Sequence, residues 1–113
     1  MEYGYRYRKK IGQMSRRVDR KIMHTEKQIE QYLVKRSREA GFMCVKWTGE
    51  TGVPDRILIA RGSVTFVEVK SPIGKLSAIQ KLMHLKLQDQ GATVVTVYGY
   101  DSVDWLINEL LTE

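Results

Sequence analysis

Asp55, Glu68 and Lys70 are residues whose types and spacing could do chemistry together. They belong to two strand-like segments joined by a short glycine-containing connection, DRILIA at 55–60 and VTFVEVK at 64–70. A two-residue turn at Arg61-Gly62 would place Asp55 directly across from Glu68. The two-residue period of a strand puts Lys70 on the same face as Glu68. We therefore predict two carboxylates and a lysine at one end of a hairpin.

Two carboxylates that face each other across a strand pair repel, and a cation between them would remove the conflict. Carboxylate oxygens suit hard ions such as Mg²⁺ and Mn²⁺, which can activate a bound water and stabilise charge on a phosphoryl oxygen. Lys70 could hold or deprotonate that water, or offset the developing negative charge. E-x-K alone is a common tripeptide and also fits a solvated strand face. The preceding Gly52-Val53-Pro54, with a proline that fixes the start of the first strand, makes the combination more specific.

The segments around this hairpin predict the order helix, three strands, helix, strand, helix. Thr25 and Gln28 form a capping-box pattern for a helix over 25–40, which Gly41 ends. The apolar, aromatic segment 42–47 predicts the first strand, and a glycine-containing loop follows it.

Ser77 is placed to cap a second helix over 77–90, which ends at Gly91. The β-branched run at 93–98 predicts a buried strand, parallel to a neighbour because a helix precedes it. Ser102 is expected to cap the last helix, whose apolar stripe comprises Val103, Leu106, Ile107, Leu110 and Leu111.

The net charge of +6 is concentrated in residues 1–24, which hold eight Lys and Arg residues against two acids. We interpret this segment as a basic, tyrosine-rich arm preceding one domain over 25–113. Basic residues alternating with tyrosines suit phosphate neutralisation and base stacking, and the candidates for nucleic-acid contact are Arg6, Arg8, Lys9 and Lys10. A solubilising or dimer-forming arm is the alternative.

Several features limit the class of protein. No apolar run approaches the roughly 20 residues that cross a bilayer, so we expect a soluble, cytoplasmic protein. The single cysteine, Cys44, cannot form an intrachain disulfide and is expected to be buried. His24 and His84 lack metal-ligand spacing, and we expect both at the surface without a catalytic role. The tryptophans are interpreted as core or interface residues, at Trp47 and Trp105.

GVPD at 52–55 and EVK at 68–70, followed by Leu76-Ser77 and Gln80 before Gly91, resemble the PD-(D/E)xK nuclease superfamily. Within it the sequence is most similar to the VRR-NUC (virus-type replication-repair nuclease) domain, from Glu26 to the strand at 93–98. The resemblance implies a restriction-endonuclease-like α/β fold, a mixed β-sheet flanked by helices in the order αβββαβα.

The resemblance also implies roles for individual residues. Asp55 and Glu68 would be metal ligands, the carbonyl of Val69 could add a ligand, and Lys70 would be the catalytic lysine. Glu26 matches the acidic residue of the family's first helix, where it would face the metal site directly or through water. Gln80 matches the family's helical glutamine, which would orient the catalytic lysine or contact the phosphate. On the residues alone, both could equally be solvated helix positions.

The implied activity is that of a Mg²⁺- or Mn²⁺-dependent endodeoxyribonuclease. Stand-alone relatives of this type are associated with phages and other mobile elements, and act as homodimers that cut branched DNA such as Holliday junctions. We expect the same here, in the cytoplasm of the host cell, with Lys46, Lys75 and Arg56 as candidate contacts to the DNA backbone. The alternatives are a nicking or flap nuclease of the same fold, and a DNA-binding module that has lost its activity.

Overall fold

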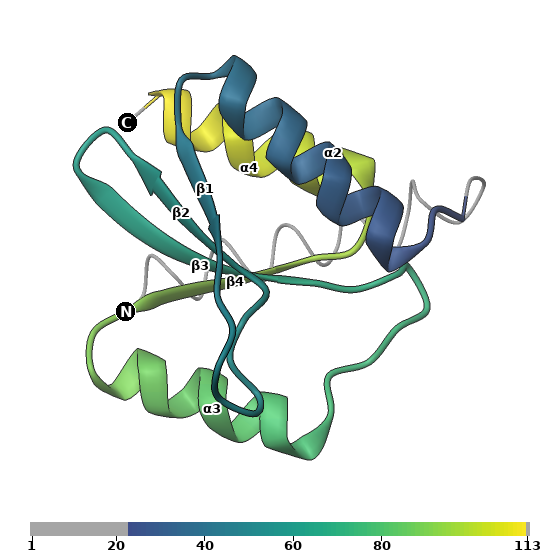
Figure 1. The fold of residues 1–113 in the computed structure, drawn as a ribbon, viewed down its shortest axis with the longest axis vertical. Coiled ribbons are helices and arrows are strands. Elements are labelled where there is room, and N and C mark those ends of the chain that lie inside the picture. Colours follow the sequence, from purple (N-terminus) through teal and green to yellow (C-terminus); the bar gives the residue numbers. More distant parts are fainter. Residues whose placement is uncertain (1–22, 113) are drawn as a thin grey trace.

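The computed structural model describes residues 23–112. Their elements are α2 (Glu26–Glu39), β1 (Met43–Lys46), β2 (Arg56–Ala60), β3 (Ser63–Val69), α3 (Ala78–Asp89), β4 (Thr93–Val97) and α4 (Tyr100–Thr112) (Figure 1). This confirms the predicted αβββαβα order, and the element bounds agree with the predicted ranges to within about two residues. Most of the basic arm, with Arg6, Arg8, Lys9 and Lys10, lies outside the described residues.

The sheet has the strand order β1-β2-β3-β4 and is mixed. The first three strands pair antiparallel, and β4 pairs parallel to β3 after the crossover through α3. Ala60 pairs with Ser63, so the connection between β2 and β3 is the predicted two-residue turn. Arg61 and Gly62 both have positive φ angles, of 51° and 87°, as a type I′ hairpin turn requires.

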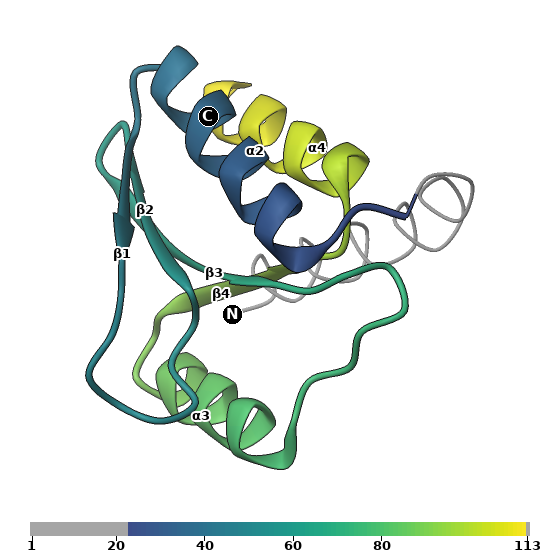
Figure 2. The ribbon, with the colours of Figure 1, turned by 45° about the vertical axis from the view of Figure 1, so that its right-hand side comes forward.

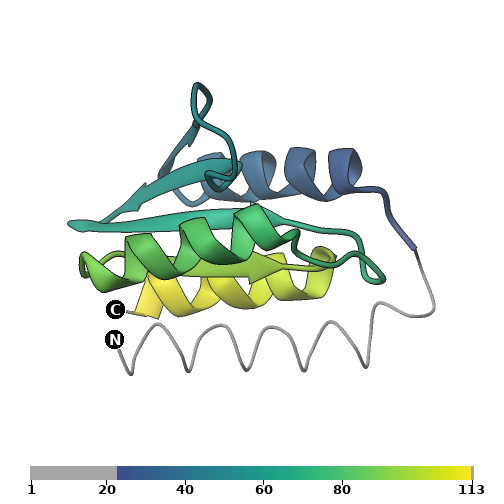
Figure 3. The ribbon, with the colours of Figure 1, turned by 90° about the horizontal axis from the view of Figure 1, so that it is seen from below.

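The helices cover the two faces of the sheet unequally. Helices α2 and α4 pack side by side on one face, and α3 lies on the other (Figures 1 and 2). The main core lies under α2 and α4, where Ile29 and Leu33 meet Leu58, Val67 and a set of further apolar residues that includes Val95, Val97, Val103, Leu106 and Ile107. Seen from the α3 side, that helix lies over β3 and β4 and leaves β1 uncovered (Figure 3).

Capping side chains define the starts of α2 and α3 as expected. Thr25 and Gln28 form one capping box, and Ser77 and Gln80 form the other. The predicted cap of the last helix is wrong, because α4 begins at Tyr100 and Ser102 lies inside its first turn. The Ser102 hydroxyl is buried and accepts hydrogen bonds from the N–H groups of Tyr98 and Gly99, at 2.9 and 3.0 Å. It stabilises the tight connection between β4 and α4.

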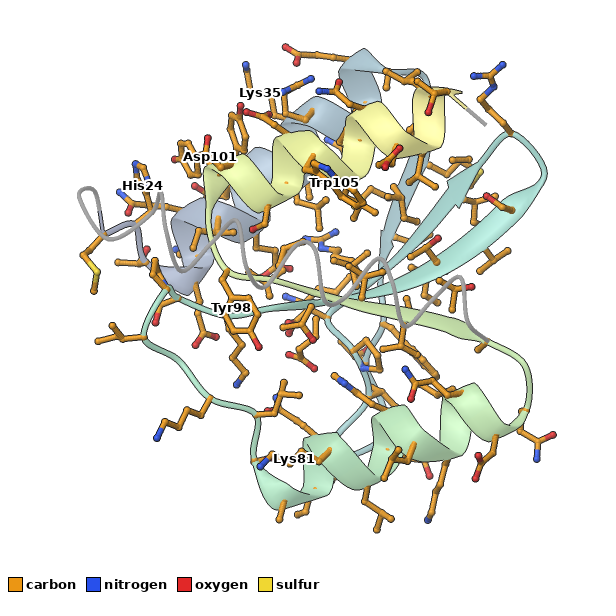
Figure 4. All side chains as sticks on the ribbon, turned by 180° about the vertical axis from the view of Figure 1, so that it is seen from behind. His24, Lys35, Lys81, Tyr98, Asp101 and Trp105 are labelled. Carbon is orange, nitrogen blue, oxygen red and sulfur yellow. The ribbon has the colours of Figure 1, made fainter. Side chains whose placement is uncertain are left out.

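An aromatic stack and an ion pair join α2 to α4. His24 stacks on Tyr100 at 3.7 Å between ring centroids, and Tyr100 stacks on Tyr32 at 4.0 Å. His24 lies just before α2 and is partly exposed (Figure 4). The Tyr32 hydroxyl donates to Asp104 at 2.7 Å, and Arg36 pairs with the same carboxylate. These contacts hold the first turn of α2, which carries Glu26, at a set place beside the sheet.

The burial of Cys44 and of the two tryptophans agrees with the sequence-based expectations, whereas that of Leu111 does not. Cys44 is buried in the core, and burial raises the pKa of its thiol. Leu111 departs from the predicted apolar stripe of α4, because 41% of it is exposed. Trp47 packs on Phe66, and Trp105 is partly buried against the core (Figure 4). Within residues 23–112, no helix has the length and apolar character needed to cross a membrane.

Candidate active site

The hairpin brings Asp55 and Glu68 together. Arg56 pairs with Val67, so the next pair outward sets Asp55 against Glu68. Asp55 Oδ2 accepts a hydrogen bond from the Val69 N–H at 2.8 Å, and the Asp55 carbonyl accepts one from Trp47 at 3.1 Å. The side chain and the backbone of Asp55 are therefore held by the strands on either side.

Glu68 is buried, with 1% of its surface exposed. Burial raises its pKa to about 9, and the hydrogen bond and negative charge of Asp55 act in the same direction. The positive charge of Lys70 opposes this rise, and the charge of Glu26 adds to it. A carboxyl group with this pKa is protonated at neutral pH unless a cation takes the proton's place.

Helix α3 provides the other contacts to Glu68. Gln80 Nε2 donates to Glu68 Oε2 at 3.3 Å, and His84 Nε2 lies 3.1 Å from Glu68 Oε1. The Gln80 side-chain oxygen also accepts from the Ser77 N–H at 2.9 Å, as part of the capping box. The described contacts thus connect Gln80 with Glu68 and the start of α3, whereas the expected role was toward the lysine or the phosphate.

The loop before β2 is packed against the start of α3. Gly52 has a φ of +88°, and a Cβ added there would lie 2.6 Å from Ile79 Cγ2 and 3.0 Å from the Ile79 carbonyl oxygen. Only a glycine fits this combination of backbone conformation and close approach. The contact joins the segment that carries Asp55 to the helix that carries Gln80.

Lys70 and Glu26 complete the group around Glu68. Lys70 follows β3 directly, and its N–H donates to the Val97 carbonyl at 2.9 Å, so the backbone pairing continues through it. Glu26 is exposed in the first turn of α2, yet its charge is near enough to act on Glu68. The predicted hairpin residues and both predicted helix residues therefore gather around one buried carboxyl group.

Comparisons with known proteins indicate a nuclease. No family model matches the chain. It is 34% identical over 79 residues to "Putative nuclease p44" of Acyrthosiphon pisum secondary endosymbiont phage 1, an alignment that covers 67% of this chain and 85% of that protein. A solved structure titled "VRR_NUC domain" is 28% identical, with a TM-score of 0.65, and the match covers 75% of this chain and 97% of that one. The chain belongs to the VRR-NUC nuclease family.

The donor set of this VRR-NUC site fits a hard divalent cation. Asp55 and Glu68 supply carboxylate oxygens, and a cation bound between them would favour the charged form of Glu68, which its burial and the charge of Asp55 disfavour. Among residues 23–112, no group of three or more His, Cys, Asp or Glu side chains forms a ready cage for a metal ion. Mg²⁺ commonly binds through one or two carboxylates and keeps several waters, so a site with few protein ligands suits it.

His84 contradicts an expectation. It was expected at the surface, but 2% of it is exposed and it contacts Glu68. A signal for this position was present in the sequence, because His84 follows Gln80 by four residues and side chains at that spacing share one face of a helix. Metal-ligand spacing indicates only whether a histidine can bind a metal directly. It does not indicate whether the histidine contacts a carboxylate such as Glu68.

The predicted DNA-contacting lysines lie in two separate surface clefts. Lys46 is exposed and lines a cleft of about 510 Å³ together with Lys27, Gln31, Val34, Arg38, Arg56 and Glu30. Arg56 is not free there, because it pairs with Glu30 at 2.8 Å. Lys75 lies in a second cleft, of about 540 Å³, with Lys81 and Tyr98 (Figure 4). One cleft lies beside the start of β2 and the other is lined by the segment that follows Lys70.

Proposed function

We propose that this nuclease is a Mg²⁺- or Mn²⁺-dependent endodeoxyribonuclease that acts as a homodimer on branched DNA. The observation that carries the metal-dependent chemistry is the buried carboxyl group of Glu68, opposed by Asp55 and adjacent to Lys70. Such a group is costly in a protein that needs only stability, because a buried charge must be paired or hydrogen-bonded.

Asp55 and Glu68, with the Val69 carbonyl, would hold the divalent ion, and Glu26 could reach it through water. When bound, the ion supplies a water of lowered pKa and stabilises negative charge on the phosphoryl oxygen. Lys70 orients the attacking water or offsets charge at the scissile phosphate. Gln80 holds one oxygen of Glu68 through the contact of 3.3 Å.

The two basic clefts support a DNA substrate. Lys27, Arg38 and Lys46 lie on the side where β2 begins, and Lys75 and Lys81 lie on the side reached from Lys70. Strands of a branched molecule that pass on both sides of the site would find phosphate partners in each cleft. The arm residues Arg6, Arg8, Lys9 and Lys10 would add contacts that depend on salt and not on sequence.

An exposed apolar patch supports the homodimer. Met43, Ile59 and Val64 are neighbours across three strands, and Val45 lies two residues from Met43 on the same face. All four are at least 36% exposed, on the face opposite the main core. β1 is also an edge strand of the described sheet. We propose that a second copy covers this patch, because a two-fold dimer places two sites in the fixed relation that paired cuts in a symmetric junction need.

The test of activity is cleavage of synthetic four-way junction, flap and duplex DNA with Mg²⁺, Mn²⁺ or EDTA. EDTA, Lys70→Ala and Asp55→Asn should each abolish cutting. Lys35→Ala is the matched control, since Lys35 pairs with Glu39 on the exposed side of α2 and should leave the rate unchanged (Figure 4). Cutting that survives EDTA and Lys70→Ala would contradict the mechanism. Preference for flaps or nicked duplex would support the alternative nuclease, and binding without any cutting would support an inactive DNA-binding module.

The dimer is tested by sedimentation at micromolar concentration. Met43→Lys combined with Val64→Lys should give monomers and lose paired cutting of the junction. Ile73→Lys changes an exposed apolar residue in the loop after β3 and should leave the dimer intact. A monomeric wild-type protein, both free and on junction DNA, would overturn the homodimer.

A further inference from the structure

His84 lies on the face of α3 that is turned toward the sheet, four residues after Gln80. Within α3, His84 is the residue that is buried. Three apolar residues of the same helix, Ile79, Leu82 and Leu85, are 53 to 57% exposed. A helix that only packed on a sheet would turn its leucines inward and its polar residues outward. In α3 the polar residues Gln80 and His84 face Glu68, so something other than apolar packing explains their position.

The two α3 side chains contact different oxygens of one carboxyl group. Gln80 Nε2 reaches Glu68 Oε2, and His84 Nε2 lies 3.1 Å from Glu68 Oε1. The last torsion of a glutamate side chain is broad, so a single hydrogen bond leaves the carboxyl plane free to rotate. Contacts to both oxygens from one rigid helix restrict that rotation. An ionised carboxylate can only accept, so the Nε2 of His84 carries the proton when Glu68 is charged.

We propose that His84 is a positioning residue for the metal site, which donates from Nε2 to Glu68 Oε1 and fixes the carboxylate in the orientation that binds the divalent cation. The inference rests on the proposed function, because it assigns Glu68 as a metal ligand. Hydrogen bonds of this kind to a ligating carboxylate commonly contribute about 10- to 100-fold to metal affinity or activity. A histidine that only fills space beneath the sheet would make no such contribution.

The experiment measures Mn²⁺ binding by calorimetry on the full chain, together with the melting temperature in EDTA. His84→Leu replaces the ring with an apolar side chain of related size and so removes the hydrogen-bond donor. His84→Gln places its amide Nε2 at about the same distance from the backbone as the ring Nε2 of histidine. We expect His84→Leu to weaken Mn²⁺ binding by about 10- to 100-fold and His84→Gln to stay within a few-fold of wild type. Val94→Ala is the stability control, because Val94 is buried on β4, under the same helix, and has no polar side-chain atom.

Val94→Ala should lower the melting temperature without changing the Mn²⁺ affinity. If His84→Leu fails to fold, His84→Asn takes its place, because its amide stops at the position of Nδ1 and cannot reach Glu68. Wild-type Mn²⁺ affinity in His84→Leu or His84→Asn would overturn the positioning role, and so would a His84→Gln protein as weak as His84→Leu. A wild-type protein that binds neither Mn²⁺ nor Mg²⁺ would instead contradict the proposed metal-dependent function, so the two failures are distinguishable.

Discussion

The raised pKa of Glu68 predicts that the metal-free protein loses stability as pH rises. The folded pKa of about 9 lies above the ordinary value of 4.5 that the unfolded chain would have. Between these values the native state holds one more proton than the unfolded state, so the free energy of unfolding falls with increasing pH. The stabilisation is fully present below about pH 4.5 and is lost as pH rises toward about 9.

The expected size of the effect follows from this linkage. One proton corresponds to about 1.4 kcal/mol for each pH unit, so the loss between pH 5 and pH 8 is about 4 kcal/mol. The free energy of unfolding of a small domain is about 5 to 15 kcal/mol, so this loss is a large share of it. Glu68→Gln keeps the shape of the side chain without a titrating proton. Its stability should be close to that of wild type near pH 5 and about 4 kcal/mol higher near pH 8.

The assay is urea denaturation in EDTA at several pH values, followed by the fluorescence of Trp47 and Trp105. Glu39→Gln is the matched control, because Glu39 is exposed on α2 and its removal should leave the wild-type slope in place. Mg²⁺ must displace the proton from Glu68, so its affinity should rise by up to about tenfold per pH unit below about pH 9. Parallel pH profiles of stability for wild type and Glu68→Gln would refute the conclusion that this pH dependence arises from Glu68.

Three further predictions concern other parts of the chain. Gly52→Ala should lower the free energy of unfolding by about 2 kcal/mol more than Gly49→Ala, as denaturation would measure. Both glycines have positive φ, but only a Cβ at Gly52 would meet Ile79, so equal losses would contradict that contact. Ser102→Ala should cost about 1 to 3 kcal/mol, since two N–H groups lose their buried acceptor, and the exposed Thr112→Ala should cost almost nothing. Deleting residues 1–23 should weaken DNA binding and flatten its salt dependence, as fluorescence anisotropy over a salt series would measure, and an unchanged slope would favour a solubilising arm.

The elements most accurately predicted from the sequence are those with local signals. The capping boxes at Thr25 and Ser77 and the turn at Arg61-Gly62 are written in residues a few positions apart, and the structure has each of them. The start of α4 was misplaced because a serine before an apolar run is a common cap. Here Ser102 bonds instead to the two residues that precede the helix, Tyr98 and Gly99, and that geometry depends on where β4 ends.

The site was predictable where it depends on the hairpin and not where it depends on packing. A two-residue turn and the strand period are enough to set Asp55 against Glu68. The burial of Glu68 depends on α3 covering it, and neither strand carries a signal for that. Glu26 is separated by 42 positions from Glu68 and comes near it only through the packing of α2 on the sheet. Its assignment therefore needed the family resemblance.

The role of His84 depends on both a local sequence signal and the packing of α3. Its spacing from Gln80 is a local signal that places both side chains on one face of a helix, whereas metal-ligand spacing alone does not detect it. In this fold the hairpin determines which carboxylates meet, and α3 determines how one of them is held, because Glu68 is contacted through both oxygens from a single helix. The proposed role of His84 implies that the chain could keep Asp55, Glu68 and Lys70 unchanged and still lose metal affinity by substitutions on α3. A motif confined to the strands therefore describes the ligands of such a site and omits the residues that orient them.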